Sequence, residues 1–210
     1  MVCNKLTLKM KHLKYTILIS LLSSCSKTND NQYIELSIVD NFFPDEYKTG
    51  SKAVFVNSSR KSLTLSISYL DEVSEQTIGT TGLMFLQDNF FVNLTTDTGK
   101  VGILVNGSAF VNSDLSEIRP FVSYLMRSGT SISNSSLQME ARLETNQVVT
   151  TCDGNFDVSK SILGREFFNV YGAVCAENQS FSELYVNEEF GIVGFKDDEN
   201  ELWAFDKFEN

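Results

Sequence analysis

Histidine is almost absent from this chain of 210 residues. The only one, His12, lies in a basic and apolar leader that we expect to be removed on export. A mature protein without histidine cannot use Ser-His-Asp or Cys-His catalysis. It also lacks the commonest ligand of zinc and other transition metals. No P-loop and no GxGxxG motif is present, so the sequence predicts no cofactor, no metal site and no catalytic residue.

Cysteine is also scarce. Of the four cysteines, Cys3 lies in the leader and Cys25 at its end, which leaves Cys152 and Cys175 as an even pair. In an oxidising compartment this pair predicts a disulfide, which would contribute roughly 3 kcal/mol by loop closure. Two buried thiols are the alternative. No CxxC redox motif is present, and two cysteines cannot form a structural zinc site.

Basic residues are few, with 17 Lys and Arg against 27 Asp and Glu. Four lysines belong to the leader, so the mature chain has 13 basic and 27 acidic residues, a net charge of −14. Such a surface repels phosphate backbones, so we expect no nucleic-acid partner. It also disfavours a polybasic membrane patch.

The N-terminus has the features of an export signal. Four lysines precede an apolar run over Tyr15–Leu22, which is too short to span a bilayer. Leu22-Ser23-Ser24-Cys25 follows and resembles the lipobox of bacterial lipoproteins. The resemblance implies cleavage before Cys25 and attachment of acyl chains, such as palmitate, to that cysteine. An ordinary signal peptide with a chance cysteine is the alternative.

The residue that follows Cys25 indicates the membrane to which a lipoprotein is sorted. Ser26 stands there instead of aspartate, which resembles the outer-membrane class of lipoproteins. We therefore expect a lipid-anchored protein of the cell envelope, held at the outer membrane on its periplasmic or surface face. The predicted organisation is a signal peptide over 1–24, the lipidated cysteine and a flexible tether over 25–32, and one β-rich domain over 33–210. The polar tether reaches on the order of 15 Å.

Alternation of apolar and polar residues predicts a mainly β domain. The predicted strands are Tyr33–Val39, Ala53–Val56, Leu63–Tyr69, Phe121–Arg127, Met139–Leu143, Val148–Cys152, Phe167–Val174, Glu183–Val186, Gly191–Lys196 and Glu201–Phe205. For Phe121–Arg127 a short helix that starts at Pro120 is the alternative. Asn106-Gly107 predicts a type I′ hairpin that joins Val101–Val105 to Ser108–Val111. A short helical turn is expected over Ser159–Gly164. The fold class is an antiparallel meander with little helix, which forms a twisted half-barrel or a sandwich.

The C-terminal strands carry a second resemblance. Leu184–Val186, Phe190–Phe195, an acidic turn and Leu202–Phe205 are similar to the tail of a group of uncharacterised outer-membrane lipoproteins. Phe43-Pro44 with Gly50–Phe55 resembles the first hairpin of that group. The resemblance implies an antiparallel sheet and an envelope location, and it transfers no activity.

Three polar motifs are predicted to be turns. Asp153–Asp157 opens like a calcium loop, but Val158 and Gly164 stand where an EF-hand needs glycine and glutamate. Asp197-Asp198-Glu199 is predicted to be a solvated hairpin tip. Ser58–Lys61 matches S-x-x-K without its companion motifs.

Aromatic residues on the C-terminal strands are the remaining site candidates. Tyr171, Tyr185 and Trp203 could stack on a sugar ring if they shared an exposed face. The alternative, which their place on strands favours, is that all three belong to the core.

The favoured function is a lipid-anchored, non-enzymatic binding or structural module. One alternative is a carrier of lipid or another apolar ligand in the half-barrel. Another is a carbohydrate-binding or glycoside-cleaving domain, which would need a carboxylate pair beside exposed aromatics. The expected partners are the membrane, through the lipid anchor, and a protein, glycan or lipid ligand.

Overall fold

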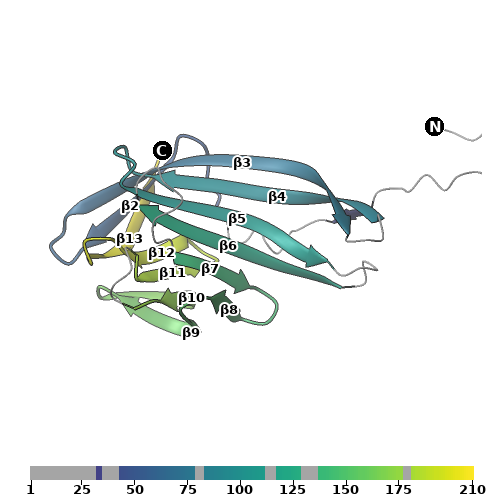
Figure 1. The fold of residues 1–210 in the computed structure, drawn as a ribbon. Helices are drawn as coiled ribbons and strands as arrows, with labels where there is room; N and C mark the ends of the chain where they lie inside the picture. Colours follow the sequence, from purple (N-terminus) through teal and green to yellow (C-terminus); the bar gives the residue numbers. More distant parts are fainter. Residues whose placement is uncertain (1–31, 35–42, 79–82, 112–116, 129–136, 177–180) are drawn as a thin grey trace, which may run out of the picture. The chain divides into compact units, whose positions relative to one another are not determined.

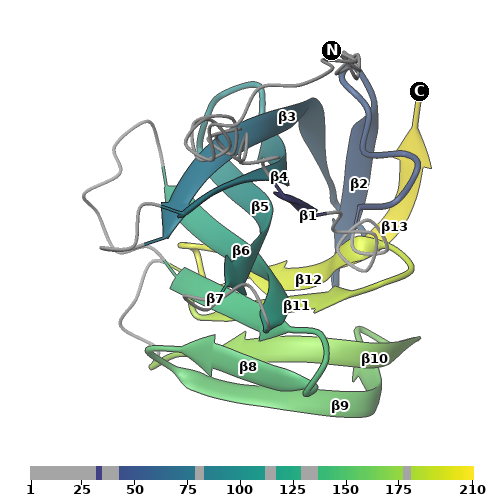
Figure 2. The same cartoon turned by 90° about the vertical axis from the view of Figure 1, so that its right-hand side faces the viewer.

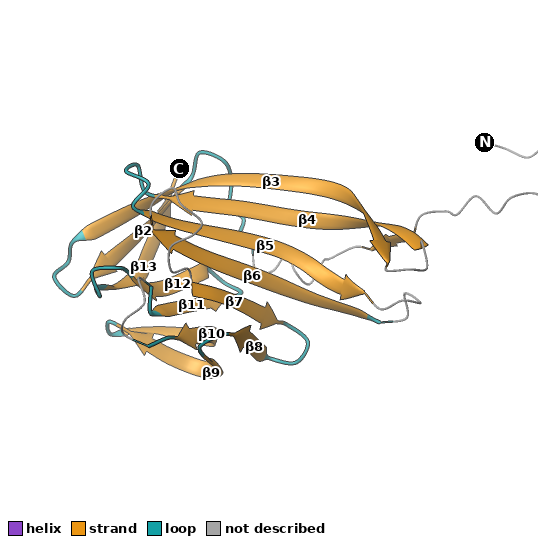
Figure 3. Ribbon diagram, in the orientation of Figure 1, coloured by secondary structure: helices purple, strands orange, loops and turns teal. Residues whose placement is uncertain are grey.

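The computed structural model describes residues 32–34, 43–78, 83–111, 117–128, 137–176 and 181–210. The chain divides into two units, 1–31 and 32–210, and every described residue belongs to the second. Within these residues the chain forms strands and turns (Figure 3). No helix among them is long and apolar enough to cross a membrane.

Thirteen strands within the described residues form a single sheet. Their bounds are β1 Gln32–Ile34, β2 Lys52–Asn57, β3 Ser62–Ile78, β4 Leu83–Thr95, β5 Val101–Val111, β6 Ile118–Ser128, β7 Leu137–Arg142, β8 Gln147–Thr150, β9 Asp153–Ile162, β10 Arg165–Val174, β11 Glu183–Asn187, β12 Gly191–Lys196 and β13 Leu202–Glu209.

The sheet is an antiparallel meander that curls on itself. Its order is β8-β7-β6-β5-β4-β3-β2-β13-β12-β11-β10-β9, so the last strand pairs with β2 (Figure 1). The short β1 runs parallel to the start of β4. The edge strands β8 and β9 lie side by side (Figure 2), and a Cβ added at Gly154 of β9 would lie 2.8 Å from Val148 of β8. The predicted antiparallel β fold is confirmed, as a nearly closed barrel and not as a sandwich.

Apolar side chains, which alternate with polar ones along the strands, fill the inside of this barrel. Val92, Val105, Tyr124 and Met139 occupy one row across β4 to β7 and are fully buried. Each such apolar side chain contributes about 1.5–3 kcal/mol through burial. The row belongs to one continuous apolar cluster that extends through β2, β12 and β13. The described interior is therefore a packed core.

The predicted hairpin at Asn106-Gly107 is wrong. β5 is one continuous strand, in which Asn106 pairs with Phe91 on one side and Ser123 on the other. A type I′ turn needs a positive φ at both central residues, and neither residue has one. Hydrogen-bonded partners on both edges hold this dipeptide extended and override its local turn preference.

The helical turn predicted over Ser159–Gly164 is also wrong. β9 continues to Ile162, and the chain reverses at Leu163-Gly164, with φ values of 51° and 80°. Of the predicted strand Tyr33–Val39, the structure describes only the part in β1, because 35–39 lie outside the described residues. The strand predicted over Val148–Cys152 ends at Thr150. The other predicted strands are confirmed.

The two internal cysteines lie at disulfide distance, with Cα atoms 4.7 Å apart. Cys152 directly precedes β9 and Cys175 directly follows β10. They lie one position beyond the cross-strand pair Asp153–Val174. A disulfide between them would close the open end of the β9–β10 hairpin, at the seam where the two edges of the sheet approach each other.

Candidate functional site

Three hairpin turns meet at one end of the sheet, which we call the turn end. They are Asn57–Lys61 between β2 and β3, Thr96–Lys100 between β4 and β5, and Asp197–Glu201 between β12 and β13. In each turn the first carbonyl accepts a hydrogen bond of 2.8–3.0 Å from the N–H of the fourth residue. The fourth residues all have positive φ and are Arg60, Gly99 and Asn200. The repeated geometry brings three polar loops around one opening.

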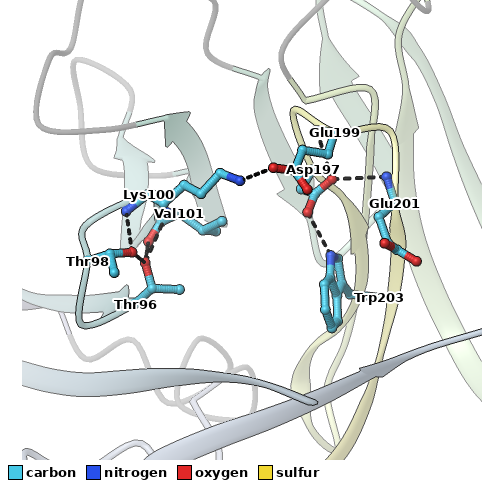
Figure 4. Close-up of polar contacts among 8 residues, drawn as sticks. All are labelled: Thr96, Thr98, Lys100, Val101, Asp197, Glu199, Glu201 and Trp203. Atoms are coloured by element: carbon cyan, nitrogen blue, oxygen red, sulfur yellow. Dashed lines mark hydrogen bonds and ion pairs between the residues drawn. The ribbon is translucent and has the colours of Figure 1, made fainter. Parts of the chain in front are cut away.

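Asp197 is the organising residue of the turn end. Its side chain is buried, and Oδ1 accepts hydrogen bonds from the backbone N–H groups of Glu199 and Glu201 at 3.0 and 2.9 Å. Its Oδ2 accepts a hydrogen bond of 2.8 Å from the indole Nε1 of Trp203 (Figure 4). A buried carboxylate with three donors is well satisfied. The network fixes both the turn and the indole ring.

An ion pair spans the opening between two hairpins that are far apart in the sequence. Lys100 Nζ, from the β4–β5 turn, pairs with Glu199 Oε1, from the β12–β13 turn (Figure 4). This hydrogen bond raises the pKa of Lys100 and lowers the pKa of Glu199. Both side chains are exposed, so solvent screening leaves the pair little weight in stability. It joins two turns that lie far apart in the sequence.

Beneath this ion pair lies the turn-end cavity, of about 320 Å³. Its apolar wall is made by Leu63, Val101 and Trp203, which pack in or against the core. Its polar wall is made by Ser62, Thr64, Thr96, Asp97, Thr98, Lys100, Asp197 and Glu199. Small-molecule sites often lie in the mouths of β-barrels, where placed polar groups fix the orientation of a ligand. We therefore take this cavity as the candidate site.

Other described cavities fit a ligand less well. One of about 380 Å³ is bounded by Phe43, Tyr47 and Tyr69, but 35–42, which directly precede Phe43, lie outside the described residues. A second, of about 460 Å³, lies beside Phe168 and the β11–β12 turn. A third, of about 260 Å³, lies on the outer side of β7 and β8. Neither of the last two has a wall built from the core.

The three aromatic residues singled out in the sequence do not share an exposed face. Tyr171, Tyr185 and Trp203 are only 1, 6 and 8% exposed. Tyr171 donates a hydrogen bond to Asn146 Oδ1 and Tyr185 donates one to Glu183 Oε2, each at 2.8 Å. Burial raises the pKa of Tyr171 to about 12 and that of Tyr185 further. Of the three, only Trp203 lines the turn-end cavity.

The segment Asp153–Asp157 is not a turn or a calcium loop. It lies in β9, where Asn155 donates a hydrogen bond of 2.8 Å to Asp157 Oδ2. No group of three or more His, Cys, Asp or Glu side chains is placed to hold a metal ion within the described part of the chain. The S-x-x-K segment Ser58–Lys61 is part of a turn, as predicted.

The role of Asp197 is not among those predicted from the sequence. The sequence predicts a solvated hairpin tip, whereas Asp197 is buried and the next three residues, Asp198, Glu199 and Asn200, are exposed. The available signal was an aspartate at the first turn position, where its side chain caps N–H groups two and four residues on. The predicted lipidation site, Cys25, lies outside the described residues.

Comparison with known proteins finds no relative of this chain. No family model matches the chain, and neither the curated proteins nor the solved structures contain a match.

Proposed function

We propose that the protein is a lipid-anchored, non-enzymatic binding module of the bacterial cell envelope, which takes its ligand in the turn-end cavity. The observation that carries the binding role is the cavity itself, whose indole wall is held in place by Asp197. The lipid anchor rests on the resemblance of Leu22–Cys25 to a lipobox. Three acyl chains on Cys25 would make membrane attachment practically permanent.

The packed interior argues against a carrier of lipid within the barrel. A carrier needs an empty apolar chamber, whereas the row from Val92 to Met139 and the rings of Phe55, Phe195 and Phe205 fill the described interior. A ligand held at the mouth is compatible with this core. A binding module therefore agrees better with the packing than a carrier does.

Lipidation is tested on the full-length protein made in a diderm bacterium. We expect mass spectrometry of the mature N-terminal peptide to show cleavage before Cys25 and a triacylated cysteine, and we expect the protein in the membrane fraction. Cys25→Ser should abolish acylation and leave the signal uncut. Cys3→Ser is the matched control and should change neither. An unacylated mature N-terminus would refute the anchor.

A further inference from the structure

We propose that the outer face of the β5–β6 hairpin contacts the lipid bilayer directly, through the stacked rings of Phe110 and Phe121. The proposal rests on the lipid anchor and names a second contact with the same membrane. It begins from the alternation along β5, in which Ala109 and Val111 pack against the core and Phe110, between them, faces outward. Phe110 is 50% exposed, and its ring stacks on that of Phe121 with the centroids 4.5 Å apart.

The two rings in contact are an apolar surface that the packed core does not use. Phe121 is half-buried, and only the next residue, Val122, lies in the core. Transfer of the rings from water to acyl chains is favourable in proportion to the apolar area removed. Stacking fixes the two rings in one orientation, so the contact costs little side-chain freedom.

The charged residues beside the rings leave this patch without net charge. The cross-strand partners of the two rings are both arginines, Arg119 and Arg142. Each forms an ion pair with the glutamate two residues before it, Glu117 or Glu140. The mature chain is expected to carry a net charge of −14, so a neutral patch is where repulsion by anionic headgroups is weak. Arginine also suits a membrane boundary, because its charged end can stay at the headgroups while its apolar part follows the rings inward.

The tether limits how far the domain can lie from the bilayer. Six residues, 26–31, lie between Cys25 and Gln32 in the sequence. Fully extended, this segment spans at most about 25 Å. A lipid on Cys25 therefore holds β1, which begins at Gln32, close to the membrane surface.

The aromatic pair lies at the end of the sheet where β1 lies. β1 pairs with β4 at residues up to Gln87 (Figure 1). In the register between β4 and β5, Phe90 pairs with Gly107. Gln87 and Phe110 each lie three residues beyond this pair, in the same direction. The strand held by the tether and the exposed rings are thus at one end of the domain.

The size of the patch favours a bilayer over a second copy of the chain. Two aromatic side chains bury at most about 150–250 Å² each, whereas a standard protein interface buries roughly 800 Å² of each partner. A bilayer contact needs no such area, because the anchor already holds the domain at the surface. The second contact is then intramolecular, and a weak attraction suffices.

A tryptophan at position 110 would report on this contact. Phe110→Trp is made in the acylated protein, whose acylation is checked by mass spectrometry, and placed in vesicles of phosphatidylcholine and phosphatidylethanolamine. We expect bromine on the acyl chains to quench the added emission, and we expect that emission to lie at shorter wavelength than in water. The parent protein gives the baseline, because its only tryptophan, Trp203, is buried at the turn end.

A second reporter and a matched control accompany this variant. Arg119→Trp, which lies opposite Phe110 on β6 and replaces an exposed side chain, should be quenched in the same way. Phe168→Trp is the control, because Phe168 is 59% exposed but lies on β10, between β9 and β11 in the sheet. Its emission should not respond to bromine. Far-UV circular dichroism shows whether each variant is folded.

Two results would overturn the proposal. One is quenching of Phe110→Trp and Arg119→Trp that is no greater than that of Phe168→Trp. The other is a shift to shorter wavelength that depends on protein concentration and not on lipid, which would assign the rings to a contact between two copies. Either result leaves acylation of Cys25 intact, whereas an unacylated Cys25 refutes the anchor whatever the tryptophans report. The failures of the two proposals are therefore distinguishable.

Discussion

At the scale of single residues, two buried tyrosine hydroxyls differ in their partners. The hydroxyl of Tyr124, in the middle of the core row, has no hydrogen-bond partner among the described residues, and burial raises its pKa. The hydroxyl of Tyr171 donates to Asn146 Oδ1. A buried hydroxyl without a partner costs free energy, whereas a paired one contributes to stability.

Tyr124→Phe should therefore raise the free energy of unfolding by about 1 kcal/mol, because it removes an unpaired polar group and keeps the ring. Tyr171→Phe is the matched control and should lower it by about 1 kcal/mol. Urea unfolding followed by far-UV circular dichroism measures both. A loss of stability in Tyr124→Phe would show that the hydroxyl bonds to an internal water molecule.

Sequence reasoning at this scale identified the aromatic residues but not their surroundings. Trp203 could be placed on a strand from its apolar neighbours Leu202 and Ala204. The acidic turn before Trp203 folds the carboxylate of Asp197 inward. The donors that hold it there belong to residues 199, 201 and 203, and they converge only when the hairpin has formed. Composition alone made all three acids of that turn appear solvated.

At the scale of elements, a hydrogen bond joins the segment before β2 to the start of β12. The hydroxyl of Tyr47 accepts a hydrogen bond of 3.0 Å from the backbone N–H of Ile192. The ring of Tyr47 packs edge-on against Phe43 and Phe208. Gly191 makes the contact possible, since its φ is 66° and an added Cβ would collide with the Tyr47 hydroxyl.

Gly191→Ala should accordingly be more destabilising than Gly99→Ala. Both glycines have positive φ, at 66° and 68°, so each alanine carries a conformational cost of about 1–2 kcal/mol. A Cβ at Gly99 meets open space, whereas a Cβ at Gly191 adds about 1–3 kcal/mol of overpacking. The difference between their urea-unfolding free energies isolates the Tyr47 contact. Equal values for the two variants would contradict it.

Strands were predictable from the sequence where one face of the strand is buried and the other is exposed to solvent. Met139 and Ala141 of β7 alternate with Glu140 and Arg142, and the structure buries the first pair. The errors in the predicted secondary structure lie at turns. Asn106-Gly107 is extended because long-range pairing on both edges outweighs a local preference, and the turn at Leu163-Gly164 was missed because leucine is uncommon at positive φ. Pairing partners distant in sequence cannot be read from a local window.

At the scale of the whole domain, the turn end and β1, the first described strand, lie at opposite ends of β4. β1 pairs with β4 at Phe85–Gln87, close to the beginning of that strand (Figure 1). The turn end begins just after Thr95, and from Phe85 to that residue β4 rises roughly 33 Å. Six residues, 26–31, lie between Cys25 and Gln32 in the sequence, and fully extended this segment spans at most about 25 Å from one Cα to the other.

A lipid on Cys25 would thus hold the start of β4 close to the bilayer, with the turn-end cavity on the far side. The net charge of −14 expected for the mature chain opposes a domain lying flat on anionic headgroups. We expect a fluorophore on Glu117→Cys, just before β6 and at the end of the sheet where β1 lies, to be quenched by vesicles with nitroxide headgroups. The same fluorophore on Ser58→Cys, at the turn end, should stay bright, and the additional change Cys25→Ser should abolish quenching at position 117. Equal quenching at positions 117 and 58 would mean that the domain lies flat, and a ligand would then have to reach the cavity along the membrane surface.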